Sequence, residues 1–169
     1  MRRLAPLLLI AAGLLLVTGA TGYSLYSQAL NRPASAPLPD QLAGLSLVQQ
    51  ANGPQAVAEI DRLYGKDFPL TSAAVGVYGV ESKATLWVSG LPVRFMAGRI
   101  LDSMRNRIAG SRSPFKPAGE YKDGNRTIYE LEGMGQKHFY FQSKNLVIWL
   151  AVDEPLAGQA LEQALAFYP

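Results

Sequence analysis

A long run without charged residues near the amino terminus limits how this chain can fold more than any other feature. After Arg2 and Arg3, no charged residue appears before Arg32, and most of the intervening residues are apolar. As a helix, Leu4–Tyr26 would be about 34 Å long, enough to cross a hydrocarbon core of about 30 Å. The segment is therefore predicted to be a transmembrane helix, and the membrane is an expected partner through Leu4–Tyr26.

The charges that flank this run predict its orientation. Two arginines precede it, and basic residues near a membrane helix remain preferentially on the cytoplasmic side. We therefore expect the amino terminus in the cytoplasm and the rest of the chain outside. Tyr23 and Tyr26 would then lie at the level of the outer lipid headgroups, where aromatic residues are enriched.

A cleaved signal peptide is the alternative interpretation of the same run. Its apolar centre would be Leu7–Val17, and small residues at suitable spacing would place cleavage near Ala20 or Ala29. The protein would then be secreted rather than anchored. Under both interpretations the remaining domain is expected to be extracytoplasmic.

A segment rich in proline and alanine follows the apolar run. Three of the seven residues from 33 to 39 are proline, a composition typical of a stiff, extended linker rather than a packed element. The predicted organisation is an N-terminal signal anchor or transmembrane helix over residues 1–30, a Pro/Ala-rich spacer over 31–43 and a folded domain over 44–169.

The composition excludes several kinds of site. The 169 residues include no cysteine and one histidine, which rules out disulfides, thiol catalysis, cysteine-ligated metals and any site that needs two imidazoles. The net charge of +3 comes from the arginines beside the apolar run, Arg2, Arg3 and Arg32, and the remainder is formally neutral. Because nucleic-acid-binding domains carry a net basic footprint, no nucleic acid is expected as a partner.

Hydrophobic periodicity predicts an α+β domain after residue 44. Apolar residues recur at helical spacing over 54–64, 92–110 and 155–167. Strand patterns are predicted over 45–49, 74–80, 83–88, 119–122, 127–132, 136–142 and 146–152. The order β-α-β-β-α-β-β-β-β-α indicates one mostly antiparallel sheet with helices packed on it. The unbroken apolar run 146–152 is expected to be a central strand that is covered on both faces.

No residue is assigned a catalytic, cofactor-binding or metal-ligating role, because motifs that carry such chemistry are missing. The sequence has no Gly-x-Ser-x-Gly elbow, no phosphate-binding glycine loop and no Asp-x-Asp calcium loop. His138 is expected to be a half-exposed strand residue on the face opposite Phe139. Glu130 and Glu132 are expected on a solvated face, opposite a basic residue of a neighbouring strand.

Basic residues in the middle of the sequence are the candidates for binding a partner. The helix predicted over 92–110 has an apolar stripe formed by Val93, Met96, Ala97, Ile100, Met104 and Ile108, and its arginines lie off this stripe. The candidates are Arg94, Arg99, Arg105, Arg107 and Arg112. They would suit anionic lipid headgroups or an acidic surface of a partner. The alternative is a solvated helix face whose charges pair with acidic residues of the domain.

These observations predict a non-enzymatic accessory domain that is tethered to a membrane and docks on a membrane complex or an envelope partner. The alternative is a carrier or sensor domain that binds a small apolar or anionic ligand in a groove between sheet and helix. An enzyme that uses Glu130, Glu132 and His138 is a third hypothesis. It requires these three side chains to meet in space.

Overall fold

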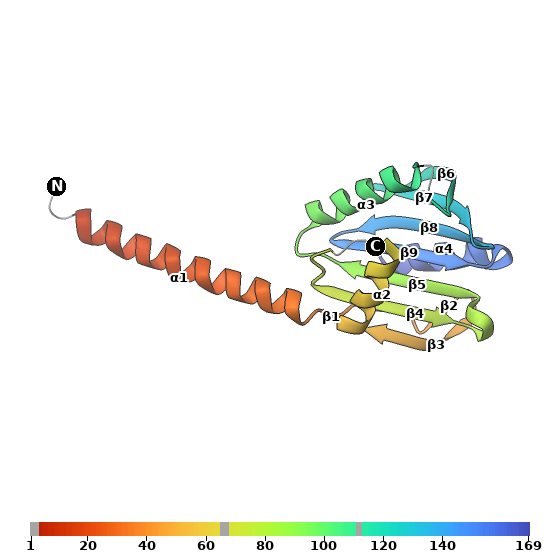
Figure 1. Cartoon of the computed structure of the whole chain (residues 1–169), viewed down its shortest axis with the longest axis horizontal. Helices are drawn as coiled ribbons and strands as arrows, with labels where there is room; N and C mark the ends of the chain where they lie inside the picture. The colour runs from red at the N-terminus through yellow and green to blue at the C-terminus, as the bar shows by residue number, and fades with distance from the viewer. Residues whose placement is uncertain (1–3, 65–67, 111–112) are drawn as a thin grey trace.

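The computed structural model describes residues 4–64, 68–110 and 113–169 and has the α+β architecture that the sequence predicts. One large sheet carries helices on both faces, and a long N-terminal helix projects away from it (Figure 1). The helices are α1 (Leu4–Asn31), α2 (Pro54–Tyr64), α3 (Arg94–Ile108) and α4 (Ala157–Phe167), with short 3₁₀ turns η1 (Val80–Ser82) and η2 (Glu154–Leu156).

Seven strands follow the predicted order along the chain, and two further short strands precede them in the segment predicted to be a spacer. They are β1 (Ala34–Ser35), β2 (Gln41–Leu42), β3 (Leu45–Asn52), β4 (Ser72–Tyr78), β5 (Ala84–Gly90), β6 (Lys116–Asp123), β7 (Arg126–Gly133), β8 (Gln136–Ser143) and β9 (Leu146–Val152). In space the order is β2-β3-β4-β5-β9-β8-β7-β6, and these neighbours are antiparallel, whereas β1 pairs with β4 in parallel. The β4–β5 hairpin and the β6–β9 meander therefore join through β5 and β9.

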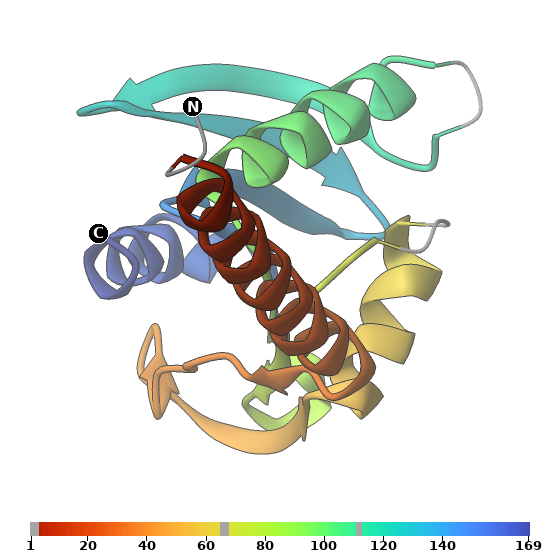
Figure 2. The same ribbon diagram turned by 90° about the vertical axis from the view of Figure 1, so that its left-hand side faces the viewer.

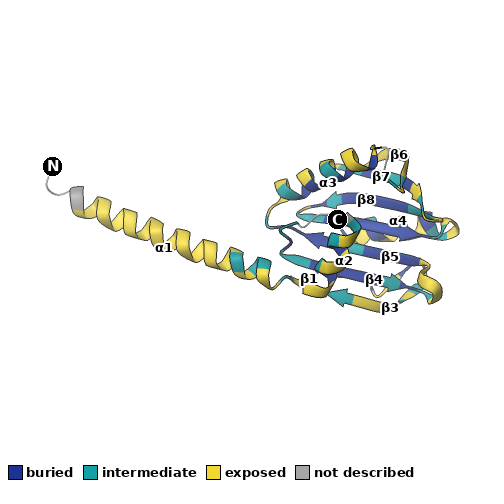
Figure 3. Ribbon diagram, viewed as in Figure 1, coloured by how far each residue is buried: buried dark blue, intermediate teal, exposed yellow. Residues whose placement is uncertain are grey.

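The N-terminal helix is exposed from Pro6 to Tyr26, in contrast to the central strands (Figure 3). Its segment Pro6–Asn31 is long and apolar enough to cross a membrane, and none of its most apolar stretch is buried inside the protein. Removing so much apolar surface from water is favourable. This helix is compatible with a membrane anchor and with a signal sequence.

The apolar strand β9 lies inside the sheet and is buried on both faces, as predicted. Its alternate side chains enter two separate cores, because successive residues of a strand point to opposite faces. Ile148 and Leu150 join the core beneath α4, whereas Val147 and Trp149 join the core beneath α2 and α3. Figure 2 shows α4 on one side of the sheet and α2 and α3 on the other.

The buried faces of α3 and α4 differ from the predicted ones at a few positions. Leu101, which the predicted stripe did not include, is buried, whereas Val93 precedes the helix and is 52% exposed. In α4, helical spacing predicts that Phe167 points inward, but it is exposed and its neighbour Tyr168 is buried in its place. The Tyr168 hydroxyl donates a 2.6 Å hydrogen bond to the carbonyl of Pro37, which explains the exchange.

The Pro/Ala-rich segment is extended, as its composition predicts, but it packs on the sheet and is not a free spacer. The Ala34 N–H donates to the carbonyl of Thr71 at 2.9 Å, and the Tyr78 hydroxyl donates to the carbonyl of Pro39 at 2.8 Å. Ala36 and Leu42 are buried in the core beneath α4. Proline carbonyls accept hydrogen bonds although proline has no N–H, so a proline-rich chain can still be fixed by donors of the domain.

Two glycines make room for this segment. A Cβ atom at Gly76 would lie 3.1 Å from the Leu38 side chain, so the glycine in this strand marks the close approach of another part of the chain. Gly53 has a φ of +54°, and a Cβ atom there would lie 2.7 Å from the carbonyl oxygen of Pro33. The chain that leaves α1 thus runs directly against the backbone between β3 and α2.

We predict that Gly53→Ala destabilises the domain more than Gly44→Ala does. Both glycines have positive φ, +54° and +75°, so alanine costs about 1–2 kcal/mol at either position. A Cβ atom at Gly44 meets nothing within 4 Å, whereas at Gly53 it meets the Pro33 carbonyl. The backbone must shift to relieve that contact, at a further cost of about 1–3 kcal/mol.

Denaturant unfolding of the full chain in detergent measures both free energies of unfolding. Gly44→Ala is the matched control, because it isolates the cost of positive φ. Equal losses in the two variants would show that Pro33 is not held against Gly53.

Candidate functional site

The arginines predicted to bind a partner lie on α3 and are exposed. Arg94, Arg99, Arg105 and Arg107 have the exposure expected of them, and Arg112 lies outside the described residues. At about 100° per residue, Arg94 and Arg105 are about 20° apart around the helix, whereas Arg99 and Arg107 lie on its other side. The structure therefore divides the four arginines between two sides of α3 and does not gather them into one patch.

Local contacts hold two of these arginines on the helix surface. Arg105 lies 3.7 Å from Asp102, and both side chains are at least half exposed. The guanidinium of Arg99 lies over the ring of Phe95, 5.8 Å from its centroid, and Phe95 is 71% exposed. An exposed ion pair is worth at most about 1 kcal/mol, so these arginines can exchange their neighbours for a binding partner at little cost.

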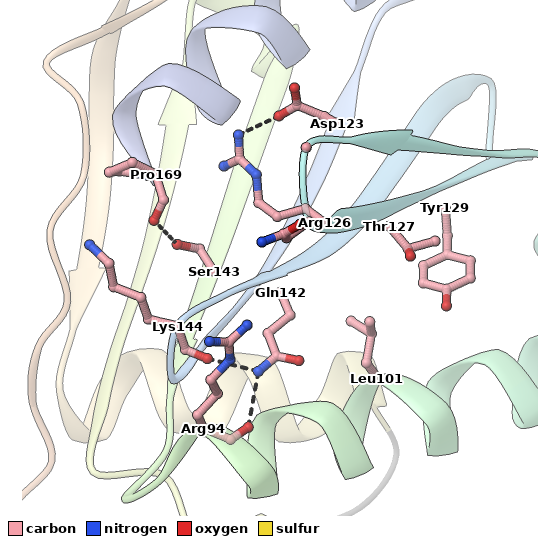
Figure 4. Close-up of a pocket in the computed structure, with 12 residues that line it drawn as sticks. Arg94, Leu101, Asp123, Arg126, Thr127, Tyr129, Gln142, Ser143, Lys144 and Pro169 are labelled. Carbon is pink, nitrogen blue, oxygen red and sulfur yellow. Dashed lines mark hydrogen bonds and ion pairs between the residues drawn. The ribbon is translucent and has the colours of Figure 1, made fainter.

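A groove of about 510 Å³ separates the start of α3 from strands β7 and β8 and the turns at their ends (Figure 4). Its lining is largely polar and includes three basic side chains. It is formed by Arg94, Leu101, Asp123, Gly124, Asn125, Arg126, Thr127, Tyr129, Gln142, Ser143, Lys144 and Pro169. Of the four described arginines that were predicted to bind a partner, only Arg94 lines this groove.

Arg126 ties the turn between β6 and β7 to the end of α4. Its guanidinium forms an ion pair with Asp123 and donates to the backbone carbonyls of Leu165 and Tyr168. It also lies 5.9 Å from the ring centroid of Phe141. A guanidinium with several fixed acceptors is a rigid group, so Arg126 supplies a stationary positive charge at the back of the groove.

Gln142 joins the start of α3 to the turn between β8 and β9. Its side-chain amide donates to the carbonyl of Arg94 at 2.9 Å and to the carbonyl of Lys144 at 2.7 Å. The Lys144 side chain extends away from Gln142 in Figure 4. Arg94 and Lys144 are both exposed, so this part of the groove can receive an anionic group without first breaking a buried contact.

Sequence reasoning missed Arg126, Gln142 and Lys144. Each lies at or beside a turn that the sequence does indicate, Asp123–Asn125 or Ser143–Asn145. The missing information was that these two turns and the start of α3 meet at one end of the sheet. Strand order decides this, and no local pattern reports strand order.

His138 is buried, so the prediction of a half-exposed residue is wrong. It is 4% exposed and lies in the sheet face beneath α3, where its ring contacts Phe115 and Trp149 at centroid distances of 4.8 and 5.9 Å. The predicted alternation is confirmed, because Phe139 belongs to the core on the other face. The apolar neighbours from a loop and from β9 come from distant parts of the sequence.

Two hydrogen bonds fix the neutral form of the His138 ring. The Trp149 indole N–H donates to Nδ1 at 3.1 Å, so Nδ1 must carry a lone pair. The proton is therefore on Nε2, which donates to the carbonyl of Gly133 at 3.0 Å. Burial lowers the pKa of the imidazole below its ordinary value, and the bond to Gly133 partly opposes that shift.

Glu130 faces a basic residue of the next strand, as predicted. Its Oε1 accepts a hydrogen bond of 2.9 Å from Nζ of Lys137, and this contact raises the pKa of the Lys137 ammonium group. Glu132 is the register partner of Lys137 across the same pair of strands. Both carboxylates thus lie beside the Lys137 ammonium group of the neighbouring strand.

The structure does not bring Glu130, Glu132 and His138 together. His138 is the register partner of Leu131, so it shares the face of Leu131, and both glutamates lie on the opposite face. Among residues 4–64, 68–110 and 113–169, no three His, Asp or Glu side chains form a group that could hold a metal ion.

We predict that the stability of the protein falls as the pH drops below about 6.5. The unfolded chain binds a proton at His138 near that pH, whereas the folded state resists it because protonation would place a second N–H against the Trp149 indole. Between the lowered folded pKa and about 6.5 the unfolded state holds more protons, so stability rises with pH there and levels off above.

Denaturant unfolding of the native protein and of His138→Gln between pH 7.5 and 5.5 measures this dependence. In the variant, the free energy of unfolding should change less with pH, because the contribution of His138 is absent. The chain has one histidine, so a proton NMR titration of the native protein shows one imidazole and provides a test that needs no variant. An imidazole pKa at or above 6.5 would contradict the prediction.

No family model, curated protein or solved structure matches this chain. Function is therefore inferred from the geometry of the domain itself. Three features bear on it: the apolar helix α1, the exposed arginines of α3 and the polar groove beside them.

Proposed function

We propose that the protein is a membrane-anchored, extracytoplasmic accessory domain that docks on an integral membrane complex or an envelope partner and has no enzymatic activity of its own. In this proposal α1 crosses the membrane with its amino terminus in the cytoplasm. The exposed side of α3 contacts an acidic surface of the partner.

The short connection between α1 and the sheet is the observation that carries the proposal. α1 ends at Asn31 and β1 begins at Ala34. The Ala34 N–H is already bonded to the carbonyl of Thr71, and the Arg32 N–H is bonded back to Gln28 in α1. A domain on so short a tether stays beside the bilayer, which supports a role next to another membrane protein.

The surface of α3 supports contact with a protein. Arg99 and Arg107 are exposed on the same side of α3, and Phe95 adds a large apolar ring beside Arg99. Arginine and aromatic residues are enriched where proteins bind one another. The formal neutrality of the chain after Arg32 means that attraction to an acidic partner depends on such local groups.

The candidate catalytic residues have structural partners, which supports a non-enzymatic role. Glu130 is paired with Lys137, and both nitrogens of the His138 ring have hydrogen-bond partners inside the domain. A general base must instead reach a proton of the substrate. Its burial leaves His138 only 4% exposed to solvent.

We predict that Arg99→Glu/Arg107→Glu reduces the amount of membrane partner that purifies with the full chain by about tenfold or more, because reversed charges repel an acidic surface. The measurement is affinity purification from membranes in a mild detergent, followed by mass spectrometry. Lys83→Glu/Lys116→Glu is the matched control, since it reverses two exposed charges away from α3. Purification of the native chain as a lone monomer would contradict docking.

The groove supports a second candidate function, binding of a small anionic ligand. Arg94, Arg126 and Gln142 favour a hydrophilic anion over an apolar ligand. We expect inorganic phosphate to raise the melting temperature of the full chain, because a ligand that binds the folded state stabilises it. Arg94→Ala should reduce that rise, whereas Arg107→Ala, which changes an exposed arginine outside the groove, should leave it unchanged. No rise in the native protein would exclude phosphate-like anions.

A further inference from the structure

One end of the domain is fixed next to the membrane helix by the register of the sheet. Ala34, the first residue of β1, pairs with Ser72, which pairs with Gly90. Gly90 pairs with Leu146, which pairs with Ser143. This row of residues crosses most of the sheet at the end from which α1 emerges, on the left of the domain in Figure 1.

The start of α3 and the turn between β8 and β9 extend beyond this row. The Leu91 N–H donates to the carbonyl of Asn145 at 3.0 Å, and the Asn145 side chain donates back to the carbonyl of Leu91 at 2.6 Å. Gln142 adds its bonds to Arg94 and Lys144. Five contiguous residues, 91–95, are thus held at the end of the domain that lies nearest to α1.

Exposed apolar and basic side chains meet at this end. Val93 is 52% exposed and Phe95 is 71% exposed. The exposed basic residues come from the position after α1, the start of α3, the end of β6 and the turn between β8 and β9. We name this set the membrane-proximal surface: Arg32, Val93, Arg94, Phe95, Lys122 and Lys144.

The opposite end of the sheet has the opposite charge. There Tyr78 pairs with Ala84, and the row continues through Lys137 and Glu132 to Lys116 of β6. Glu81 and Glu154 lie in the short 3₁₀ turns that follow β4 and β9 at this end. Together with Glu132 and Asp153 they outnumber the lysines of this end, Lys83, Lys116 and Lys137, by one, whereas basic residues prevail toward α1.

The membrane-proximal surface lies within reach of lipid headgroups if α1 spans the bilayer. Tyr26 closes the apolar stretch, and α1 continues for five more residues to Asn31, which adds about 7.5 Å. Arg32 and Pro33 then add about 7 Å at most before β1 begins. The headgroup layer on each side of the hydrocarbon core is itself about 5–8 Å thick.

We propose that the membrane-proximal surface is a second membrane contact, which lays the domain on an anionic phospholipid surface. Arg94, Lys122 and Lys144 attract the lipid phosphates, and Phe95 enters the interface, where aromatic rings are favoured. The acidic opposite end is repelled and faces the aqueous compartment. The contact rests on the anchored topology of the proposed function and defines which face of the domain is turned to the membrane.

The test uses the full chain in two kinds of vesicle, phosphatidylcholine alone and phosphatidylcholine with about 30 mol% phosphatidylglycerol. The chain has no cysteine, so Asn125→Cys places one fluorophore in the turn between β6 and β7. Val80→Cys places it at the opposite end instead. Nitroxide groups on the lipid headgroups quench a fluorophore that lies close to the surface.

We expect stronger quenching at position 125 in the anionic vesicles than in the neutral ones, and no such difference at position 80. Arg94→Gln/Lys144→Gln should return position 125 to the neutral-vesicle level, with the ratio of docked to undocked domain falling about fivefold for each cation removed. Phe95→Ser should also lower the quenching. Lys83→Gln/Lys116→Gln is the matched control, because it removes two exposed cations outside the membrane-proximal surface and should change nothing.

Equal quenching at position 125 in both kinds of vesicle would overturn the proposal, and so would a loss in the control variant as large as in Arg94→Gln/Lys144→Gln. Extraction with alkaline carbonate separates this result from failure of the anchor. Release of the chain would overturn the anchored topology and the surface contact together. Retention of the chain in the membrane, with equal quenching at position 125 in both kinds of vesicle, would overturn the surface contact alone. The same residues would then be candidates for contact with a protein partner.

Discussion

The pairing of β5 with β9 joins two parts of the chain that are far apart in sequence, and the whole domain depends on it. Without this ladder, the β4–β5 hairpin and the β6–β9 meander would each expose an open strand edge. With it, Trp87 lies opposite Trp149 on one face and Val88 lies opposite Ile148 on the other. The completed sheet gives α2, α3 and α4 apolar surfaces to cover, so helix packing and strand pairing stabilise each other.

Most secondary-structure elements could be predicted because their signals are local. The unbroken apolar run of β9 and the stripe on α3 each lie within one window of sequence. β9 was placed correctly, and the stripe was correct except that it included Val93 and lacked Leu101. The path of the Pro/Ala-rich segment could not be predicted, since composition reports stiffness and does not report contacts. The side chain of Leu38 in this segment lies close to Gly76, as does Leu47 of β3, and neither contact has a local signal in the sequence.

In the candidate site, too, the local features could be predicted and the long-range contacts could not. The exposure of the α3 arginines follows from helical periodicity within one element, whereas the groove beside them needs Arg126 and Lys144 from turns that only the strand order brings together. His138 shows the same limit. Its neighbours in sequence predict a strand residue on the face opposite Phe139, but its burial is decided by Trp149 and Phe115, which arrive from other parts of the fold.

The two edges of the sheet limit how this domain can contact anything else. β6 is an edge strand that carries Pro117, Lys116 and Lys122, with an irregular register after Pro117, and such features hinder the addition of another strand. At the other edge, β2 is two residues long and offers little backbone for pairing. Contacts are therefore expected through the exposed side of α3 and the end of the sheet beside α1. If α1 spans a membrane as proposed, its short connection to β1 keeps both surfaces close to the bilayer, and their binding partners would then lie in or beside it.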